Sequence, residues 1–307
     1  MELVRGIHNI EHRHHGCVLT IGKFDGVHQG HKAVLNNLIE QAKRLNLPSA
    51  VMVFEPQPEE VFAPDKAPAR LSSLRDKYEQ LRDIGIDRLI CVRFDTKFAS
   101  QTPEQFVEAL LVNQLGVKFL VVGDDFRFGC KRLGDFEFLR QSSATFGFEV
   151  VSTQSYRLKN CRISSTEIRD ALSTSRFKDA NEMLGRAYAI KGRVVHGEKN
   201  GRTIGFPTAN VIIKHKKAPV HGVFAVVVQW QNERRLGIAN LGKRPTLHGK
   251  RMQLEVHIFD FKDDLYGKRI CIEFVAKIRD EQKFKNIDEL KEQIKLDVKQ
   301  AKRLLKI

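Results

Sequence analysis

The sequence predicts a two-domain α/β protein, in which a doubly wound parallel sheet is followed by a small antiparallel β-barrel with a C-terminal helix. Two patterns support this fold class. Between Val18 and Leu172, short apolar segments alternate with amphipathic helical segments, which is typical of βαβ units. Beyond Gly185 the apolar segments are closely spaced and separated by turn residues, without long helices between them. The length of 307 residues accommodates two domains of about 150 residues each.

The first domain opens with a short apolar run, Cys17–Ile21, and an amphipathic helix over Ala33–Leu45 follows it. The apolar residues of that helix recur at helical spacing, and Pro48 ends it. Further strands are expected at Ala50–Phe54, Leu89–Val92, Phe119–Val122 and Val150–Val151, and further helices at Ser73–Gly85 and Thr102–Gly116. Four prolines between Glu55 and Arg70 predict an irregular loop there.

Six strands are expected in the second domain, at Tyr188–Val195, Val211–Ile213, Val223–Trp230, Leu236–Ala239, Gln253–Phe259 and Arg269–Phe274. Strands this close in sequence pair antiparallel, and a closed barrel is the most economical arrangement for them. A last helix begins at Asn286, and its apolar face is Leu290, Ile294, Val298, Ala301 and Leu305. Because a short helix ends at Gly185, we expect the domains to be residues 1–183 and 184–307.

Composition favours small anionic substrates over nucleic acid or a membrane. The net charge is +15 and the pI is about 9.7, but basic residues are interspersed with acids and form no long block. No run approaches the ~20 apolar residues of a membrane span, and the first residues lack the apolar core of a signal peptide. Five scattered cysteines favour reduced thiols in a cytoplasmic protein. We expect a monomer or a weak homo-oligomer, and a solvated loop for the histidines at positions 12, 14 and 15.

The segment from Gly22 to His31 reads GKFDGVHQGH and lies between the first strand and the first helix. In such a strand, glycine turn and helix start, backbone N–H groups face a bound anion. Gly22, Gly26 and Gly30 allow the chain to turn and a phosphate to approach closely. His28 and His31 are three residues apart, so both imidazoles can point the same way and stabilise charge on a phosphate. By itself, an H-x-x-H pair is more often half of a metal site or a loop pair without a task.

The whole string resembles the signature of the HxGH nucleotidyltransferases, and its form is similar to the FMN adenylyltransferase module of bacterial FAD synthetases. Two later strings fit the same pattern, GDDFRFG at Gly123–Gly129 and RISSTEIR at Arg162–Arg169. Alone, the second of these would indicate only a well-capped helix. The resemblance implies a Rossmann-like domain in which His28 and His31 are catalytic. It also implies ATP-binding roles for Gly22, Phe24, Asp25, Gly30, Asp125, Arg162, Ser165 and Thr166.

A second glycine-containing string, GRTIGFPTAN at Gly201–Asn210, joins two strands of the second domain. Its glycines expose backbone N–H groups, and Thr208 and Asn210 offer two hard oxygens for Mg²⁺ beside phosphates. Its composition alone also permits a plain turn that enters a strand. The string resembles the signature loop of the riboflavin kinase family. The resemblance implies that the kinase ATP site is formed by Gly201, Gly205, Pro207, Thr208 and Asn210, with Thr208 and Asn210 as metal ligands.

Glu255 alternates with Leu254 and Val256 in a predicted strand, so its carboxylate points to the opposite face. An exposed acid on an edge strand would fit this pattern equally well. By resemblance to the riboflavin kinases, Glu255 is the general base for the ribityl hydroxyl. Arg279 and Phe284 are expected in the flavin pocket.

The two halves together resemble a bifunctional riboflavin kinase/FMN adenylyltransferase. The resemblance implies that the barrel phosphorylates riboflavin to FMN and that the first domain adenylylates FMN to FAD. ATP is then the second substrate of both reactions, Mg²⁺ is the cofactor, and riboflavin, FMN and FAD are the other partners. Phe224 departs from the family, whose members commonly have tyrosine there, which removes any contact made by that hydroxyl. Two alternatives stay open: an HxGH nucleotidyltransferase for another phosphorylated cofactor precursor, and a non-enzymatic nucleotide- or RNA-binding protein.

Overall fold

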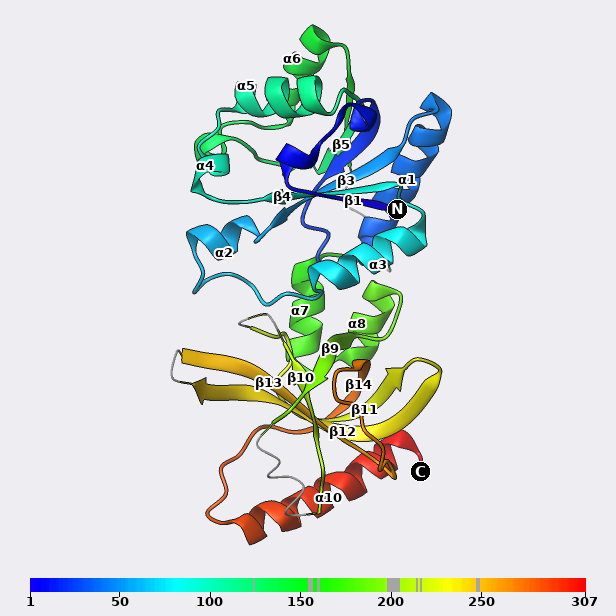
Figure 1. Cartoon of the computed structure of the whole chain (residues 1–307), viewed down its shortest axis with the longest axis vertical. Coiled ribbons are helices and arrows are strands. Elements are labelled where there is room, and N and C mark those ends of the chain that lie inside the picture. Colours follow the sequence, from blue (N-terminus) through cyan, green and yellow to red (C-terminus); the bar gives the residue numbers. More distant parts are fainter. Residues whose placement is uncertain are drawn as a thin grey trace. The chain divides into compact units, whose positions relative to one another are not determined.

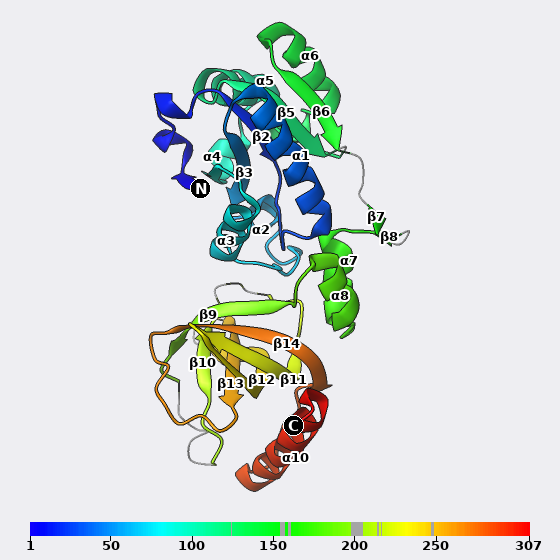
Figure 2. The same cartoon turned by 90° about the vertical axis from the view of Figure 1, so that its right-hand side faces the viewer.

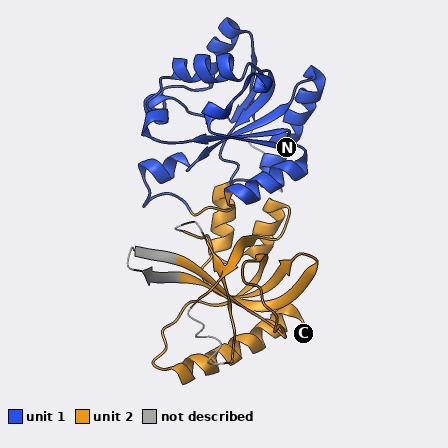
Figure 3. Ribbon diagram, in the orientation of Figure 1, with its two compact units in different colours: residues 1–68, 74–164 blue, residues 69–73, 165–307 orange. Residues whose placement is uncertain are grey.

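The computed structural model describes residues 1–123, 125–153, 157–158, 161–197, 205–213, 215, 217–246 and 249–307. For residues 157–158, 161–162, 243–246 and 249–251 it describes the backbone alone. The chain divides into two compact units (Figure 3). Unit 1 comprises residues 1–68 and 74–164, and unit 2 comprises residues 69–73 and 165–307.

Unit 1 is built on a six-stranded parallel sheet with the strand order β1-β4-β3-β2-β5-β6 (Figures 1 and 2). Its strands are β1 (Glu2–Arg5), β2 (Cys17–Ile21), β3 (Ser49–Glu55), β4 (Arg88–Arg93), β5 (Val117–Gly123) and β6 (Glu149–Thr153). The predicted doubly wound parallel sheet is therefore confirmed. Strand β1 was not predicted, because its four residues show no alternation that separates a strand from a loop.

The direction in which strands are added reverses beside β2. Strands β3 and β4 extend the sheet on one side of β2, whereas β5 and β6 extend it on the other. Such a switch point opens a crevice at the carboxyl ends of the neighbouring strands β2 and β5, where ligands of doubly wound sheets bind. The GKFDGVHQGH segment leaves β2 at this point, and Asp125 follows the end of β5.

Helices cover both faces of this sheet (Figures 1 and 2). Helices α1 (Gln29–Leu45) and α3 (Leu74–Ile84) pack on one face, and the π-helix η3 (Phe106–Gln114) and α6 (Phe136–Phe146) pack on the other. The shorter elements are η1 (Ile7–Asn9), η2 (His12–His14), α2 (Pro58–Phe62), α4 (Thr96–Ala99), α5 (Pro103–Gln105), η4 (Cys130–Arg132) and the hairpin β7 (Arg157–Leu158) with β8 (Cys161–Arg162). Each sheet face therefore has its own apolar core.

The prediction of an irregular loop over residues 55–70 is wrong for five residues. Helix α2 forms there because Pro58 occupies the first helical position, where a missing N–H costs nothing. Gln57 and Glu60 form a capping box at its start, in which the Glu60 carboxylate accepts the Gln57 backbone N–H at 2.9 Å.

Unit 2 is a closed antiparallel barrel with the strand order β10-β13-β12-β11-β14-β9 (Figure 2), as the sequence predicts. Its strands are β9 (Ala189–Val195), β10 (Ala209–Ile212), β11 (Gly222–Trp230), β12 (Glu233–Thr246), β13 (Gly249–Ile258) and β14 (Arg269–Arg279). The last helix, α10 (Ile287–Leu305), begins after the Asn286 cap and packs on the barrel through Ile294, Val298, Ala301 and Leu305. These four residues belong to the predicted apolar face.

Helices α7 (Ser165–Ser173) and α8 (Phe177–Leu184) share the apolar core of the barrel. Phe224 is 1% exposed in this core, and its ring lies edge-on to Phe177 of α8 and Phe274 of β14. A residue so placed makes apolar contacts on all sides, which suits the phenylalanine side chain.

Candidate functional sites

A strained turn carries the GKFDGVHQGH segment from β2 to α1. Phe24 and Val27 have φ angles of +46° and +40°, a region that side chains rarely adopt, and Gly26 has a φ of +83°. Strain of this kind is found mainly at functional sites, where the surrounding packing maintains it. The buried Phe24 ring packs against the His31 ring, with the ring centroids 5.0 Å apart. Phe24 thus supports His31 from the core side.

His28 and His31 form a stacked pair at the start of α1. His28 is the N-cap residue, and its Nδ1 accepts a hydrogen bond from the His31 backbone N–H at 3.3 Å. An accepting Nδ1 has no proton, so the proton of a neutral His28 ring is on Nε2. The ring centroids are 3.6 Å apart and the ring planes differ by 17°. The two imidazoles therefore share one direction, as their spacing predicts.

The surroundings of His31 favour its neutral form. Burial lowers the pKa of His31 well below its ordinary value, and the charges of His28 and Lys77 lower it further. Its Nδ1 is buried and has no hydrogen-bond partner among the residues that the structure describes. Lys77 of α3 is 1% exposed, although its place in the sequence is typical of a solvated helix residue. A buried ring nitrogen beside a buried cation suits an anionic ligand such as a phosphate.

Glycines keep the backbone close to the histidine pair. A Cβ on Gly30 would lie 3.2 Å from the His28 ring and 3.4 Å from the Ile163 carbonyl oxygen. A Cβ on Gly22 would lie 3.1 Å from the Phe24 ring. The backbone at Ile163, which precedes α7, therefore lies close to Gly30 and leaves little room for a side chain there.

The remaining predicted residues of this site have different environments. Asp25 is 1% exposed, whereas Asp125 is exposed at the carboxyl end of β5. Arg162 lies in β8, and its side chain is outside what the structure describes. Ser165 and Thr166 begin α7, as the capping pattern predicts, and this helix belongs to unit 2.

Three polar residues lie next to each other on the outer face of the barrel. Asn210 of β10 is directly opposite Glu255 of β13, and Glu255 is directly opposite Asn240 of β12. Directly opposite residues of antiparallel strands point to the same face. Leu254 and Val256 are fully buried in the barrel core, so the Glu255 carboxylate points away from that core. This orientation is the predicted one.

Gln253, which the sequence did not single out, connects two of these residues. Its Nε2 donates one hydrogen bond to Asn210 Oδ1 at 2.8 Å and another to Glu255 Oε1 at 2.7 Å. On its other side the Asn210 amide lies against Gly197, where a Cβ would come within 2.2 Å of Asn210 Nδ2. An amide oxygen and a carboxylate oxygen are therefore held at one point of the barrel surface. Only the strand register brings Gln253 next to Asn210, and this register cannot be read from the amino-acid sequence.

A second contact fixes the chain before β10. His257 Nδ1 lies 2.8 Å from the Pro207 carbonyl oxygen, and because a carbonyl only accepts, this nitrogen is the donor. The Phe206 ring lies edge-on to the His257 ring at a centroid distance of 5.4 Å. Gln253 and His257, two residues before and two residues after Glu255, thus both hold the segment that contains the predicted ATP- and metal-binding residues.

That segment is described only in part. Gly205 has a φ of +86°, which suits glycine, and Thr208 immediately precedes β10. Gly201 lies outside the described residues. The Thr208 hydroxyl and the Asn210 amide oxygen are the hard oxygen donors that Mg²⁺ takes in proteins.

Arg279, a predicted flavin-binding residue, has a structural partner. Its Nε and Nη2 donate to the carboxylate of Asp297 on α10 at 2.9 and 2.8 Å, and Nη1 donates to the Asp280 carbonyl oxygen at 2.9 Å. Asp297 is 2% exposed, so this bidentate pair is a buried link between β14 and α10. The Arg279 guanidinium also lies 5.6 Å from the centre of the Phe284 ring, the other predicted flavin residue.

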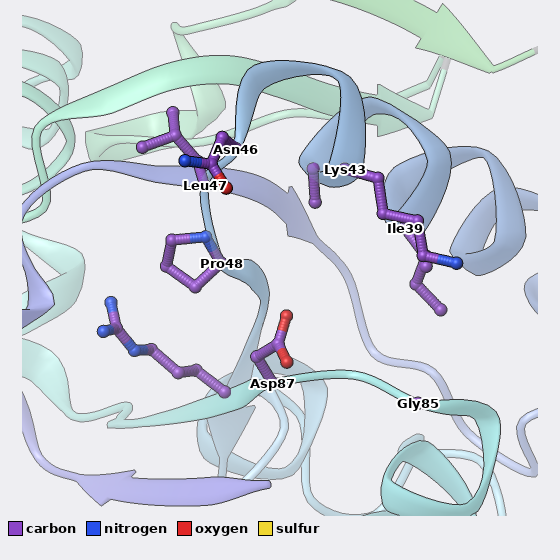
Figure 4. A pocket seen from close by; sticks show the side chains of 9 residues that line it. Ile39, Lys43, Asn46, Leu47, Pro48, Gly85 and Asp87 are labelled. Atoms are coloured by element: carbon purple, nitrogen blue, oxygen red, sulfur yellow. The ribbon is translucent and has the colours of Figure 1, made fainter.

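A pocket of about 490 Å³ in unit 1 contains none of these residues (Figure 4). It is lined by Ile39, Ala42, Lys43, Asn46, Leu47, Pro48, Gly85, Asp87 and Arg88. These residues lie at the C-terminal end of α1 and at the amino ends of β3 and β4. The Asp87 carboxylate is bonded to the Ser49 hydroxyl at 2.7 Å and to the Ser49 N–H at 2.9 Å. Ligands of doubly wound sheets bind at the opposite, carboxyl edge.

Comparison with known families matches the two halves of the chain separately. The FAD synthetase family matches residues 10–167, and the riboflavin kinase family matches residues 184–305. A bifunctional riboflavin kinase/FMN adenylyltransferase of Escherichia coli K12 is 53% identical over 299 residues, which are 97% of this chain and 96% of that protein. Proteins of the same name from Haemophilus influenzae and Pseudomonas fluorescens are 50% and 46% identical, and each alignment covers at least 98% of both proteins.

A solved structure has the same fold along the whole chain. It is a crystal structure described as a macrolide-efflux protein from Streptococcus pneumoniae, with 30% identity, a TM-score of 0.79 and coverage of 99% of both chains. Within the described ranges of the present chain, we find no helix with the length and apolar character that crossing a membrane requires. The matches in both halves and the relatives aligned along nearly their full lengths show that the chain belongs to the family of bifunctional riboflavin kinases/FMN adenylyltransferases.

Proposed function

We propose that the two reactions of this family, phosphorylation of riboflavin and adenylylation of FMN, take place at the two separate sites described above. Adenylylation is assigned to the histidine pair of unit 1, and phosphorylation to the Asn210–Glu255 face of unit 2. Both halves match flavin enzymes, which favours this function over the two alternatives that the sequence left open.

In the adenylylation site, an oxygen of the FMN phosphate attacks the α-phosphorus of ATP. The bond from that phosphorus to the pyrophosphate oxygen breaks, and pyrophosphate leaves. Negative charge builds on the α-phosphate, and His28 and His31 stabilise it. The stacked rings, the buried Nδ1 of His31 and the nearby charge of Lys77 support this role. The ATP is held by the backbone of the GKFDGVHQGH turn and by the other predicted residues, Asp125, Arg162, Ser165 and Thr166.

In the kinase site, Glu255 accepts the proton of the terminal ribityl hydroxyl of riboflavin. The resulting oxygen nucleophile attacks the γ-phosphorus of ATP, and ADP leaves. Thr208 and Asn210 would hold Mg²⁺, which when bound offsets the negative charge of the phosphates. Their hard oxygens fit that ion, and the Asn210 oxygen is already held beside the Glu255 carboxylate by Gln253.

The flavin of the kinase site is assigned to the end of β14. Phe284 offers an aromatic face, and Arg279 orients it while remaining bonded to Asp297. We also propose that the protein acts in the cytoplasm as a monomer or weak homo-oligomer. Cys17, Cys91, Cys130 and Cys271 form no disulfide within the described part of the chain, which agrees with a reducing compartment.

The observation that carries this proposal is the joint hydrogen bonding of Asn210 and Glu255 to one Gln253 nitrogen. These hydrogen bonds hold an amide oxygen, of the kind that binds Mg²⁺, close to a carboxylate, which supports the proposed roles of metal ligand and base. The purified chain should convert riboflavin, ATP and Mg²⁺ first to FMN and then to FAD, as followed by chromatography. Formation of neither product would contradict the proposal, and chelation of Mg²⁺ by EDTA should stop FMN formation.

A further inference from the structure

We propose that Gln253 is a positioning residue of the kinase site, which determines the end of the Asn210 amide that faces Glu255. The inference rests on the metal-binding role of Asn210 and the base role of Glu255 in the proposed function. Gln253 itself touches neither the metal nor the reacting atoms. It acts through the two side chains to which it donates.

The two hydrogen bonds use both protons of one amide nitrogen. Gln253 Nε2 carries two hydrogens, and they are directed to Asn210 Oδ1 and Glu255 Oε1. A donor needs an acceptor, so Asn210 must turn its oxygen, and not its nitrogen, toward Gln253. If the Asn210 amide turned over, two N–H groups would face each other and this hydrogen bond would be lost.

Gly197 confines the same amide from the opposite side. A Cβ at residue 197 would lie 2.2 Å from Asn210 Nδ2, 2.5 Å from Cγ and 2.7 Å from Oδ1. The Asn210 side chain is only 9% exposed, so it has little other room. The amide is therefore enclosed between the backbone of Gly197 and the side chain of Gln253.

The orientation matters because the two ends of an amide have opposite chemistry. The oxygen is a ligand for Mg²⁺, whereas the NH₂ group is a donor and cannot bind the ion. An amide free to turn over would present the wrong end for part of the time. Hydrogen-bond partners of metal ligands typically contribute about 10–100-fold to metal affinity or activity.

The first test replaces Gln253 by methionine, which keeps the length of the side chain and removes both donors. In Gln253→Met, the Mg²⁺ concentration for half-maximal riboflavin phosphorylation should rise by about 10–100-fold, with the KM for riboflavin unchanged. Calorimetric titration of the full chain with Mg²⁺ and the analogue AMP-PNP, without flavin, should show a similar loss at one of two nucleotide sites. Gln253→Glu keeps the shape of the side chain but offers only acceptors, so the Mg²⁺ concentration for half-maximal activity should rise at least as much. This variant takes the place of the first if the methionine variant does not fold.

The matched control is Gln229→Met in the same barrel. Gln229 Nε2 also donates to a glutamate, Glu273 Oε1, at 2.9 Å. This pair lies on β11 and β14, whereas Asn210 and Glu255 lie on β10 and β13. This variant should keep the Mg²⁺ dependence of the parent chain. FMN adenylylation should be unchanged in all of these variants, because that reaction belongs to unit 1.

A double-mutant cycle separates amide orientation from simple packing. A carboxylate has two equivalent oxygens, so in the Asn210→Asp background there is no wrong end to present. Adding Gln253→Met to that background should change the Mg²⁺ half-saturation by less than about 3-fold. Equal losses in both backgrounds would overturn the inference. If Asn210→Ala alone left the Mg²⁺ dependence unchanged, the proposed metal site would fail, independently of Gln253.

Discussion

Asn210 and Glu255 lie directly opposite each other on β10 and β13, and their side-chain oxygens are bonded to the same nitrogen of Gln253. The pairing register puts both side chains on the outer face, while their strand neighbours fill the barrel core. A carboxylate thus comes to lie beside a metal-type oxygen through backbone pairing between segments about 45 residues apart in sequence.

Glu255→Gln isolates the basicity of this carboxylate from its packing. Glutamine keeps the size and can still accept the Gln253 hydrogen bond through its oxygen, but it cannot take up a proton. The riboflavin kinase rate should fall by roughly 10²–10⁴-fold, the usual contribution of a general base. Riboflavin binding, followed by quenching of its fluorescence, should persist. A kinase rate close to that of the parent would make Glu255 a structural strand residue.

Asn240→Leu should stabilise the protein. The Oδ1 of Asn240 is buried and has no hydrogen-bond partner within the described part of the chain, and such an atom costs about 1–3 kcal/mol. Leucine has a similar shape and no polar atom, so the free energy of unfolding in urea should rise by about 1 kcal/mol. Asn240→Asp is the control, and it should destabilise because it leaves a charge at this place. A destabilised leucine variant would mean that the amide has a partner in solution, such as water.

The barrel should need helices α7 and α8 for full stability. Ile168, Leu172 and Phe177 belong to the barrel core, and Phe177 contacts Phe224 directly. A fragment of residues 165–307 should unfold at a higher urea concentration than one of residues 184–307. The free energy of unfolding of the longer fragment should be higher by more than about 3 kcal/mol. The domain boundary at residue 184 remains a prediction, and equal stability of the two fragments would support it.

The depressed pKa of His31 predicts a loss of stability on acidification. Burial keeps the folded-state ring neutral, whereas the ring in the unfolded chain takes up a proton below its ordinary value of about 6.5. The unfolded state then binds more protons, so stability falls as the pH drops below about 6.5. The melting temperature of His31→Gln should depend less on pH than that of the parent between pH 7.5 and 5. Parallel curves would show that His31 titrates normally.

Much of the fold could be predicted because the local periodicity of apolar residues indicates most of its helices and strands. Alternating apolar and helical segments predict the parallel sheet, and closely spaced strands predict the barrel. Strand β1 and helix α2 could not be predicted in this way. The first is too short to show a pattern, and the second begins at Pro58, a residue that otherwise indicates a loop.

The candidate sites were predicted from their motifs, but not the residues that support them. The motif strings identified His28, His31, Asn210 and Glu255. Gln253 and Asn240 lie beside Asn210 and Glu255 only because of the register of β10, β12 and β13, which a single sequence does not show. Lys77 appears in sequence as an ordinary polar helix residue, and its burial depends on how the chain packs around α3.

A product analysis of two variants tests most directly whether one chain carries two independent sites. His28→Ala/His31→Ala removes the two groups that we propose to stabilise the transferring phosphate, so this variant should convert riboflavin to FMN with little FAD. Glu255→Gln should form little FMN from riboflavin, yet convert added FMN to FAD at the parent rate. An equimolar mixture of the two variants should make FAD from riboflavin again, because FMN released by one is a substrate for the other. Loss of both reactions in either variant, with the fold intact, would contradict the assignment of the two sites.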